Sequence, residues 1–425
     1  MVALSSPAPA GLAAELGRPL SALQIRVFLL CALVVLLDGY DLQAMGLAVP
    51  TLAREWHRSS SAFTLAQTAS VLGLGLGSAF IAPWGDRLGR RPLLLGGLAI
   101  ILVTSLGAAT ATSTGQLAAW RLLVGLGLGV GQSNASALTA EYAPLARRAT
   151  IMTVMGVCVA FGGMLAGLTA PQVIAAAGWR GLFLVGAALP LLALIATVVG
   201  LPESPSIRAA AARSGGTLLA LLRPPYRERT LRLWLVYGLS AMMLYFLIGW
   251  LPQFLINAGL APTQAAHGMA LLQFGGIAGS LVQAWLVDRD RTITALVGAY
   301  SMTLITALLF AVFGVGPAWP LLLVLMGSGV AGVVMSIIAL GAIFYPPQIR
   351  ATGFGWAGAV TRIGAVLGPL AGGWILATGV GPRFTLGLIA LPALLCILGA
   401  LAMRRSVAEA TASLSDTGSR IGVTS

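Results

Sequence analysis

Apolar runs of about 20 residues recur along almost the whole of this 425-residue chain. The hydrocarbon core of a bilayer is about 30 Å thick, so a helix that spans it needs roughly 20 such residues. Only 9% of the residues are charged, whereas a soluble domain carries about 25%. The sequence therefore predicts an all-α membrane protein with twelve spans, at residues 25–50, 62–84, 92–112, 115–140, 149–176, 180–201, 231–257, 265–287, 292–314, 318–343, 351–377 and 383–403.

The basic residues indicate how these spans are oriented. The net charge is +13, but the arginines lie in short loops between apolar runs and form no basic aqueous module, so we expect no nucleic-acid partner. When the even-numbered loops and both termini are placed on one side, nineteen arginines lie on that side and four on the other. Positively charged loops stay in the cytoplasm, so both termini are predicted to be cytoplasmic.

The chain repeats itself at an offset of 202 residues. Three pairs of landmarks share this offset: Asp86-Arg87 with Asp288-Arg289, Arg148-Ala149-Thr150 with Arg350-Ala351-Thr352, and Pro50 with Pro252. The longest polar break, at residues 202–230, separates two bundles of six spans, residues 25–201 and 231–404, and tails are expected at residues 1–24 and 405–425. Repeated halves with a site at their interface are a known architecture of secondary transporters.

Two carboxylates, Asp38 and Asp41, lie in the middle of the first span, where a charge costs about 2.5–3.5 kcal/mol. They are three residues apart and therefore share one face of a helix. Residues of this kind usually face a protein interior or a water-filled cavity. The second half has Ser240 and Met243 at the equivalent positions, so this chemistry belongs to the first half alone. The pair predicts a proton or cation site, and the alternative is a pair of helix-cap or loop carboxylates.

Arg121 opens the fourth span, at a depth within about two helical turns of Asp41. An ion pair between them would offset the cost of burying both charges. The alternative is an arginine whose side chain extends to the outer interface. We therefore expect proton coupling to involve Asp38, Asp41 and Arg121.

Arg362 lies about twelve residues into the eleventh span, near the bilayer midplane. A lone guanidinium at that depth attracts an anion, and its planar shape suits a carboxylate. The alternative is a structural contact with a helix-end carbonyl. Aromatic side chains at similar depths can flank an aromatic ring. The predicted substrate-binding residues are therefore Arg362, Tyr40, Tyr245, Phe274 and Trp356.

The loop of residues 85–92 joins the second and third spans and reads Gly-Asp-Arg-Leu-Gly-Arg-Arg-Pro. Its glycines permit tight turns, and its charges can pair with neighbouring helix ends. Glu141, at the inner end of the fourth span, is expected to pair with Arg147, Arg148 or this loop, and a solvated carboxylate is the open alternative. The loop resembles a signature of the major facilitator superfamily, which latches the cytoplasmic face, so the predicted gate comprises Asp86, Arg87, Arg90, Arg91, Glu141 and Arg148.

Further segments resemble the aromatic acid:proton symporter family of that superfamily, namely residues 38–41, 121–131, 141–142, 178–180, 201–205, 350–356 and 362–364. The resemblance implies uptake of benzoate-like or hydroxybenzoate-like anions with protons across the bacterial inner membrane. It also implies roles in transport for Asp38, Asp41, Asp86, Arg121, Glu141 and Arg362. Protons are the expected coupling ion, no other cofactor and no metal is expected, and we expect a monomer.

Other functions remain as alternatives. An exporter of small organic anions or drugs is disfavoured by residues 162–167 of the fifth span, which lack the Gly-Pro pair of the drug-exporter hallmark. A membrane sensor of aromatic acids would need an output domain, and residues 406–425 are a short, weakly patterned tail. An enzyme is not expected, because the sequence contains no recognisable nucleophile–base set, metal cluster or phosphate loop.

Overall fold

The computed structural model describes residues 19–204, 221–224, 226–345 and 347–404. Helices make up nearly all of these residues, and none of them lies in a β-strand. Nine helical segments within the described ranges are long and apolar enough to cross a membrane. Most of the two predicted tails and of the predicted linker at residues 202–230 lies outside the described residues.

The first group of helices begins with α2 (Ala22–Glu55), where the Ser21 hydroxyl caps the first turn by accepting from the Gln24 backbone amide at 3.2 Å. The predicted second span is irregular, since its α-helix passes through one π-helical and one 3-10 turn before the loop. The other elements of this group are η1 (Ser60–Phe63), α3 (Thr64–Leu76), η2 (Gly77–Ile81), η3 (Ala82–Trp84), α4 (Gly85–Leu88), α5 (Arg90–Ala109), α6 (Thr114–Tyr142), η4 (Leu145–Arg147) and α7 (Arg148–Gly200).

The second group contains the helices that follow the linker. In chain order they are α9 (Arg227–Asn257), α10 (Pro262–Val287), α11 (Thr292–Phe313), α12 (Trp319–Val330), α13 (Val334–Phe344), α14 (Pro347–Ala377), α15 (Pro382–Gly387) and α16 (Ala390–Ala402).

Four predicted spans differ in detail from the helices observed. The fifth and sixth spans both belong to α7, which turns at Gly178, where φ is +62° and the absence of a Cβ atom permits this conformation. The tenth span is divided into α12 and α13, and the twelfth into α15 and α16. Irregular backbone at membrane depth is tolerated where it is buried or lines a cavity. Ala331 and Val333, in the break of the tenth span, do line a cavity.

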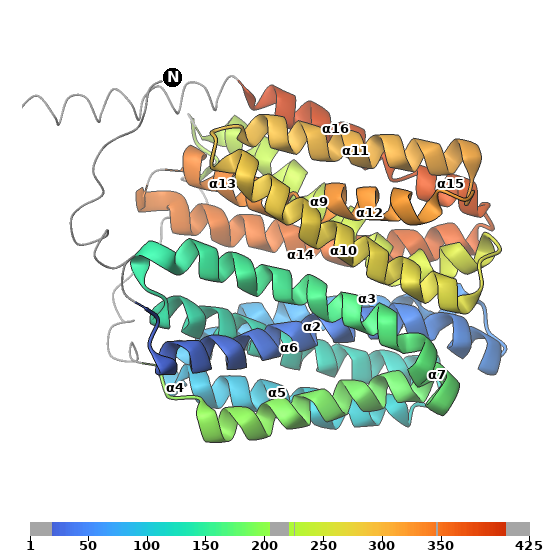
Figure 1. Cartoon of the computed structure of the whole chain (residues 1–425), viewed down its shortest axis with the longest axis horizontal. Helices are drawn as coiled ribbons and strands as arrows, with labels where there is room; N and C mark the ends of the chain where they lie inside the picture. The colour runs from blue at the N-terminus through green and yellow to red at the C-terminus, as the bar shows by residue number, and fades with distance from the viewer. Residues whose placement is uncertain (1–18, 205–220, 225, 346, 405–425) are drawn as a thin grey trace, which may run out of the picture.

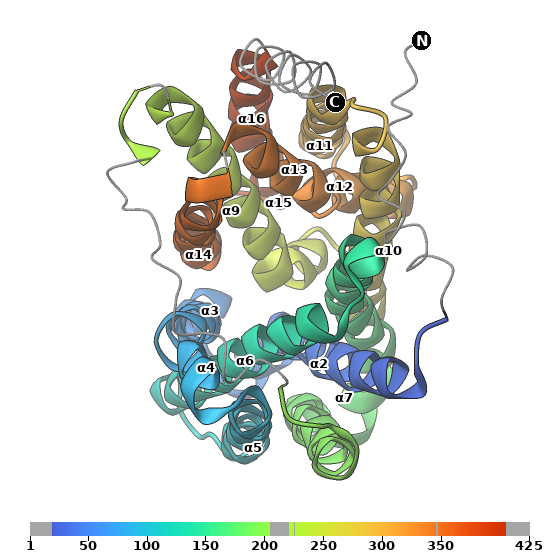
Figure 2. The same ribbon diagram turned by 90° about the vertical axis from the view of Figure 1, so that its left-hand side faces the viewer.

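The helices form two layers that face each other. Figure 1 shows α2–α7 in one layer and α9–α16 in the other, and the view along the helices in Figure 2 shows the same division. The layers meet where α2 lies against α9, α3 against α14, and α7 against α10. The last two contacts are equivalent under the 202-residue repeat, so the interface has the pseudo-symmetry that the sequence implies.

Close helix contacts also repeat at an offset of 202 residues. A Cβ atom on Gly162 of α7 would lie 2.0 Å from the Leu36 carbonyl oxygen, and one on Gly364 of α14 would lie 2.0 Å from the Gly238 carbonyl oxygen. Small residues of this kind let membrane helices pack backbone to backbone. Three further pairs of contacts correspond in the same way: Gly73–Leu122 with Gly275–Val324, Gly125–Ser70 with Gly327–Leu272, and Gly77–Leu126 with Gly279–Ser328.

Substituting Gly162 with alanine is expected to push α7 away from α2 and to lower the free energy of unfolding by about 1–3 kcal/mol, the usual cost of overpacking. Gly96→Ala in α5 is the matched control, because a Cβ atom there meets nothing within 4 Å and alanine favours a helix more than glycine does. Unfolding in detergent–SDS mixtures measures both variants. Equal stability of the two would contradict the tight contact at Leu36.

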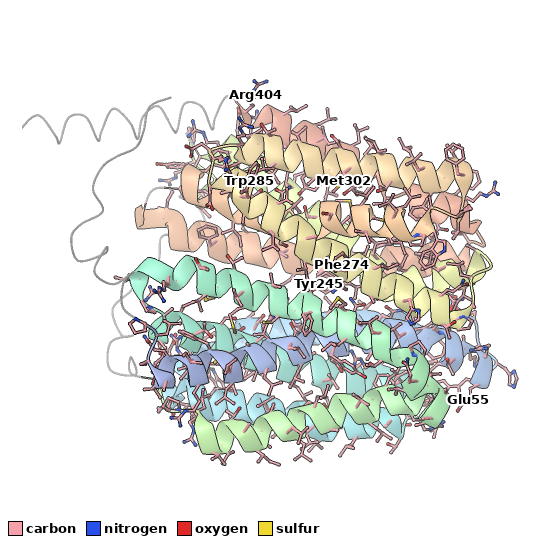
Figure 3. All side chains as sticks on the ribbon, in the orientation of Figure 1. Glu55, Tyr245, Phe274, Trp285, Met302 and Arg404 are labelled. Atoms are coloured by element: carbon pink, nitrogen blue, oxygen red, sulfur yellow. The ribbon has the colours of Figure 1, made fainter. Side chains whose placement is uncertain are left out.

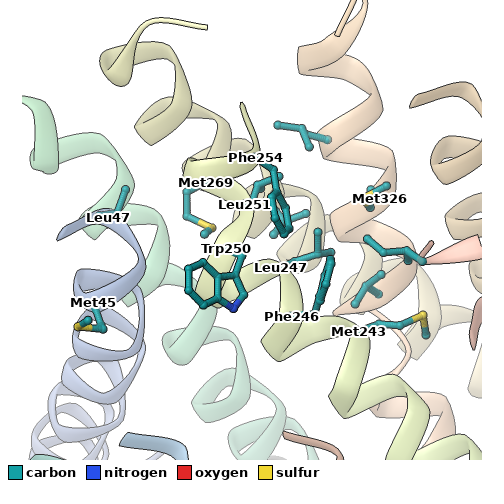
Figure 4. Close-up of a cluster of buried hydrophobic side chains, with 14 of the residues drawn as sticks. Met45, Leu47, Met243, Phe246, Leu247, Trp250, Leu251, Phe254, Met269 and Met326 are labelled. Atoms are coloured by element: carbon teal, nitrogen blue, oxygen red, sulfur yellow. The ribbon is translucent and has the colours of Figure 1, made fainter. Parts of the chain in front are cut away.

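The buried core on the side remote from the linker joins the two layers. Figure 4 shows Met45 and Leu47 of α2 in the same cluster of apolar side chains as Trp250 of α9. The Trp250 ring is fully buried, and its indole N–H donates to the Pro369 carbonyl oxygen at 2.9 Å. A Cβ atom on Gly46 would lie 2.6 Å from the Ile248 carbonyl oxygen. The two halves are therefore in direct contact around Gly46 and Trp250.

Candidate functional site

Arg121 of α6 and Asp41 of α2 form a buried ion pair. The Arg121 Nη1 donates to Asp41 Oδ1 at 2.8 Å, and Nη2 lies 2.8 Å from Oδ2. The Arg121 Nε donates to the Ser70 hydroxyl at 2.7 Å, and the Phe183 ring centre lies 5.7 Å from the guanidinium carbon. Arg121 is 0% exposed, so the ion pair predicted from the sequence is present and the side chain does not extend to the outer interface.

Asp38 is buried one turn before that pair and has different partners. Its Oδ2 accepts from the Gln132 side-chain amide at 2.5 Å, whereas its Oδ1 is buried without a hydrogen-bond partner among the described residues. Asp38 also interacts electrostatically with Asp41 and with Arg362 of the other half. The two carboxylates are therefore unlike: Asp41 is held by a guanidinium, and Asp38 keeps one oxygen available for a proton or a ligand.

Arg362 lies on α14 and meets the first half across the interface. Its aliphatic carbons lie 3.8 Å from the place where a Cβ atom would stand on Gly75 of α3. Tyr245 of α9 lies near enough to Arg362 and to Asp38 to interact electrostatically with both side chains. Three helices thus bring a cation, a phenol and a carboxylate together near the middle of the molecule.

A cavity of about 350 Å³ lies between the two halves beside these residues. Cavities of roughly 300–1,000 Å³ are typical of small-molecule sites. Most of its lining is aliphatic or glycine. Gln132, which donates to Asp38, lines it, and so does Tyr245, which interacts electrostatically with Arg362 and Asp38, so the cavity lies beside the partners of both charged groups. Its polar lining residues are Gln132, Thr153, Tyr237, Ser240, Tyr245, Gln273, Ser280 and Thr361.

The structure brings only part of the predicted substrate-binding set to this cavity. Tyr245 lines it, and Tyr40 is buried near Asp41. Phe274 and Trp356 are 53% and 40% exposed, and neither lines the cavity. Figure 3 shows Tyr245 and Phe274, which lie on α9 and α10. An aromatic residue of known depth can still face lipid, because depth does not fix the rotation of its helix, so we leave Phe274 and Trp356 out of the candidate site.

Five of the six predicted gate residues lie on α4, α5 and α6, and the sixth, Arg148, begins α7. Arg90 lies 3.1 Å from Asp86 and 3.0 Å from Glu141, which is one of the pairings expected for Glu141. Arg87 and Arg148 are exposed, and no ion pair joins either of them to another described residue. The cluster therefore centres on Arg90, which links the loop of the first hairpin to the end of α6.

A second set of contacts ties this loop to the end of α7. The Arg91 guanidinium donates to the Val198 carbonyl oxygen at 2.7 Å, and the Arg91 backbone amide donates to the Glu203 carboxylate at 3.2 Å. The Tyr142 hydroxyl donates to the Glu203 carbonyl oxygen at 3.0 Å, and the Gln24 side chain donates to the Tyr142 carbonyl oxygen at 2.9 Å. Four helices of the first half are thereby joined on the linker side.

Sequence reasoning missed three residues of these networks: Gln132, Ser70 and Glu203. The spacing of Gln132 could have indicated it, because this residue stands eleven residues after Arg121 and therefore about three turns along the same face of α6. Ser70 carried no signal, since it is one of several small polar residues in its span. Glu203 entered only through the family resemblance of residues 201–205, without a partner.

The comparisons with known proteins agree with this geometry. The family model of the Major Facilitator Superfamily matches residues 31–344. A gallate transporter of Pseudomonas putida is 32% identical over 93% of this chain and 95% of its own length. A 3-(3-hydroxy-phenyl)propionate transporter of Escherichia coli K12 is 36% identical over 85% of this chain and 88% of its own length.

The fold also matches a solved structure. A D-xylose-proton symporter aligns with a TM-score of 0.71 over 89% of this chain and 97% of that one, at 17% sequence identity. At that identity the match supports the fold alone. This protein is a multi-pass membrane transporter of the major facilitator superfamily, and within that superfamily the chain belongs with the aromatic acid transporters.

Proposed function

We propose that this protein imports aromatic carboxylates of the benzoate or hydroxybenzoate type together with protons, by alternating access. The observation that carries the proposal is the meeting of Arg362, Asp38 and Tyr245 beside a cavity between the two halves. A guanidinium suits a carboxylate, the largely apolar wall suits an aromatic ring, and a carboxylate inside a membrane is typical of proton pathways. The names of the gallate and 3-(3-hydroxy-phenyl)propionate transporters support the aromatic class.

In the proposed cycle the substrate carboxylate binds the Arg362 guanidinium. Its ring then lies along the aliphatic wall, which includes Val157, Leu244 and Ile248. Tyr245, within reach of Arg362, orients the guanidinium toward the cavity. The binding energy therefore comes from one charge-assisted contact at the carboxylate end and from apolar burial along the ring.

The proton is assigned to Asp38, and Asp41 is assigned a structural function. Both Asp41 oxygens lie 2.8 Å from Arg121 nitrogens, so a proton would have to compete with a guanidinium there. The buried Oδ1 of Asp38 has no such partner among the residues that the structure describes. An ionised Asp38 competes with the substrate for Arg362. Protonation of Asp38 removes that competition, and this couples proton binding to substrate binding.

The orientation follows from the arginine distribution. We place the protein in the bacterial inner membrane, as a monomer with both termini in the cytoplasm. The cavity residues of α7 and α9, such as Thr153 and Tyr237, lie in the parts of these helices that follow the loops on the linker side. The cavity then belongs to the cytoplasmic half, which corresponds to an inward-facing state. We assign the cluster around Arg90 and Glu141 to the gate on that face.

Replacing Arg362 with methionine is expected to raise the KM for an aromatic acid about 10- to 100-fold, because a hydrogen bond to a charged group contributes about 1.5–3 kcal/mol. Initial rates of uptake into proteoliposomes measure the change. Arg383→Met, at an exposed position of α15, is the control and should leave the KM unchanged. An unaltered KM in the Arg362 variant would remove this residue from the substrate site.

Transport itself is tested with the purified protein in proteoliposomes. A radiolabelled panel of benzoate, 4-hydroxybenzoate, gallate and succinate is offered outside, with the outside more acidic than the lumen. Protein-free vesicles correct for passive entry of the neutral acids. We expect accumulation of an aromatic acid above the protein-free level, no accumulation of succinate, and loss of the gradient-driven part with a protonophore. Release of preloaded aromatic acid driven by an inward proton flux, without accumulation, would identify an exporter instead.

A further inference from the structure

Gln43 of α2 is buried inside the interface without a hydrogen bond. It is 1% exposed, and neither its amide nitrogen nor its amide oxygen has a partner among the residues that the structure describes. Buried amides in proteins are almost always hydrogen-bonded. A carboxamide left unpaired near a ligand cavity is therefore a candidate for binding a ligand.

Gln273 of α10 brings a second carboxamide to the same place from the other half. A Cβ atom on Gly163 of α7 would lie 2.5 Å from the Gln273 Nε2 and 3.1 Å from the Gln43 Nε2. The two side chains thus lie next to each other, in the space left by a residue without a side chain. Gln273 also lines the cavity between the halves, so the pair of carboxamides adjoins the proposed substrate site through Gln273.

A third glutamine, Gln283, offers a comparison within the helix that carries Gln273. Gln283 lies on α10 as well and is also buried. Its Nε2 donates to the Ala295 carbonyl oxygen at 2.9 Å, and its Oε1 accepts from the Ser336 hydroxyl. Both polar atoms of the Gln283 side chain are therefore hydrogen-bonded, whereas neither polar atom of the Gln43 side chain is.

The carboxamides stand at the opposite wall of the cavity from the cation. Figure 2 shows α14, which carries Thr361 and Arg362, on one side of α9 and α10, which carries Gln273, on the other. A ligand held at Arg362 by a carboxylate therefore points its far end toward the glutamine pair. Tyr245 of α9 lines the cavity between these two walls.

We propose that Gln43 and Gln273 form a subsite that binds a ring hydroxyl of the substrate and so selects hydroxylated aromatic acids over unsubstituted benzoate. The inference rests on the proposed function and specifies its substrate. A phenolic hydroxyl donates one hydrogen bond and accepts others, and a carboxamide does both. Benzoate lacks the hydroxyl and leaves the Gln43 amide unpaired. Sites that hydrogen-bond a hydroxyl discriminate strongly against analogues that lack it.

The test compares 4-hydroxybenzoate with benzoate in proteoliposomes for the wild type, Gln273→Met and Gln43→Met. Methionine is of similar length and has no amide. The KM for 4-hydroxybenzoate should rise about tenfold in each variant, as expected for one lost hydrogen bond. The KM for benzoate should change less than twofold. Gln172→Met, at an exposed position of α7, is the control and should change neither value.

The unfolding midpoint is a second measurement, because replacing a glutamine that stabilises the fold would lower it. Gln43→Met removes an unpaired buried amide, so its unfolding midpoint should equal or exceed that of the wild type, whereas Gln283→Met should unfold earlier. An equal rise in KM for both acids, or unchanged KM values for both, would overturn the subsite while leaving aromatic acid transport standing. A wild type that accumulates neither acid would overturn the proposed function and the subsite with it.

Discussion

Replacing Arg121 with methionine is expected to lower the free energy of unfolding by about 3–5 kcal/mol, because the substitution leaves the Asp41 carboxylate buried without its partner. Arg121 is completely buried, and its guanidinium nitrogens lie 2.8 Å from both Asp41 oxygens. The variant should also fail to transport. Unfolding in detergent–SDS mixtures, followed by tryptophan fluorescence, measures the loss.

Two further variants test whether the loss of stability comes from the unpaired Asp41 carboxylate or from the removal of any arginine. Arg180 forms an ion pair with Glu55 at 2.8 Å, but both side chains are exposed, and exposed pairs contribute only about 0–1 kcal/mol. Arg180→Met should therefore unfold nearly like the wild type. The double variant Arg121→Met with Asp41→Asn removes both buried charges and should recover most of the lost stability. If the double variant is as unstable as Arg121→Met, an unpaired charge is not the cause.

Replacing Asp38 with asparagine is expected to abolish uphill accumulation while preserving exchange of substrate across the membrane. The substituted side chain cannot carry a proton, but its amide oxygen can still accept from Gln132, which donates to Asp38 at 2.5 Å. The loss of negative charge leaves Arg362 available to the substrate carboxylate. Accumulation driven by a pH gradient should fall to the equilibrium level, and counterflow against preloaded unlabelled substrate should stay within a few-fold of the wild type.

Asparagine substitutions of Asp41 and Asp86 test whether Asp38 is the residue that carries the proton. Asp41→Asn breaks the pair with Arg121 and should impair both accumulation and counterflow, because it disturbs the structure rather than the coupling alone. Asp86→Asn changes an exposed carboxylate of the hairpin and should preserve proton coupling. Full accumulation by Asp38→Asn would exclude Asp38 as the proton carrier.

Much of the fold could be predicted because its causes are local in sequence. Apolar length predicts the spans, and the offset of 202 residues predicts two equivalent halves, which the glycine contacts of Gly162 and Gly364 reproduce. The breaks at residues 331–333 and within the twelfth span could not be read from hydropathy, because an apolar run looks the same whether its backbone is continuous or broken. The turn between the fifth and sixth spans was predicted between residues 176 and 180, and the structure has it at Gly178.

The candidate site was predictable to a different degree at each residue. The Asp41–Arg121 pair followed from the cost of burying charges, since few partners at that depth are available. The positions of Phe274 and Trp356 depended on helix rotation, which residue depth does not specify. Gln43 and Gln273 were not singled out because a glutamine in an apolar run is ordinary until its lack of a partner becomes visible in three dimensions.

The most direct test of proton symport is to measure whether protons enter the vesicles together with the substrate. In weakly buffered proteoliposomes without an imposed gradient, external 4-hydroxybenzoate is added while a pH-sensitive dye reports the lumen. The wild type should acidify the lumen faster than protein-free vesicles and faster than Asp38→Asn vesicles, in parallel with entry of labelled substrate. Protein-dependent entry of the labelled acid without protein-dependent acidification would contradict proton symport.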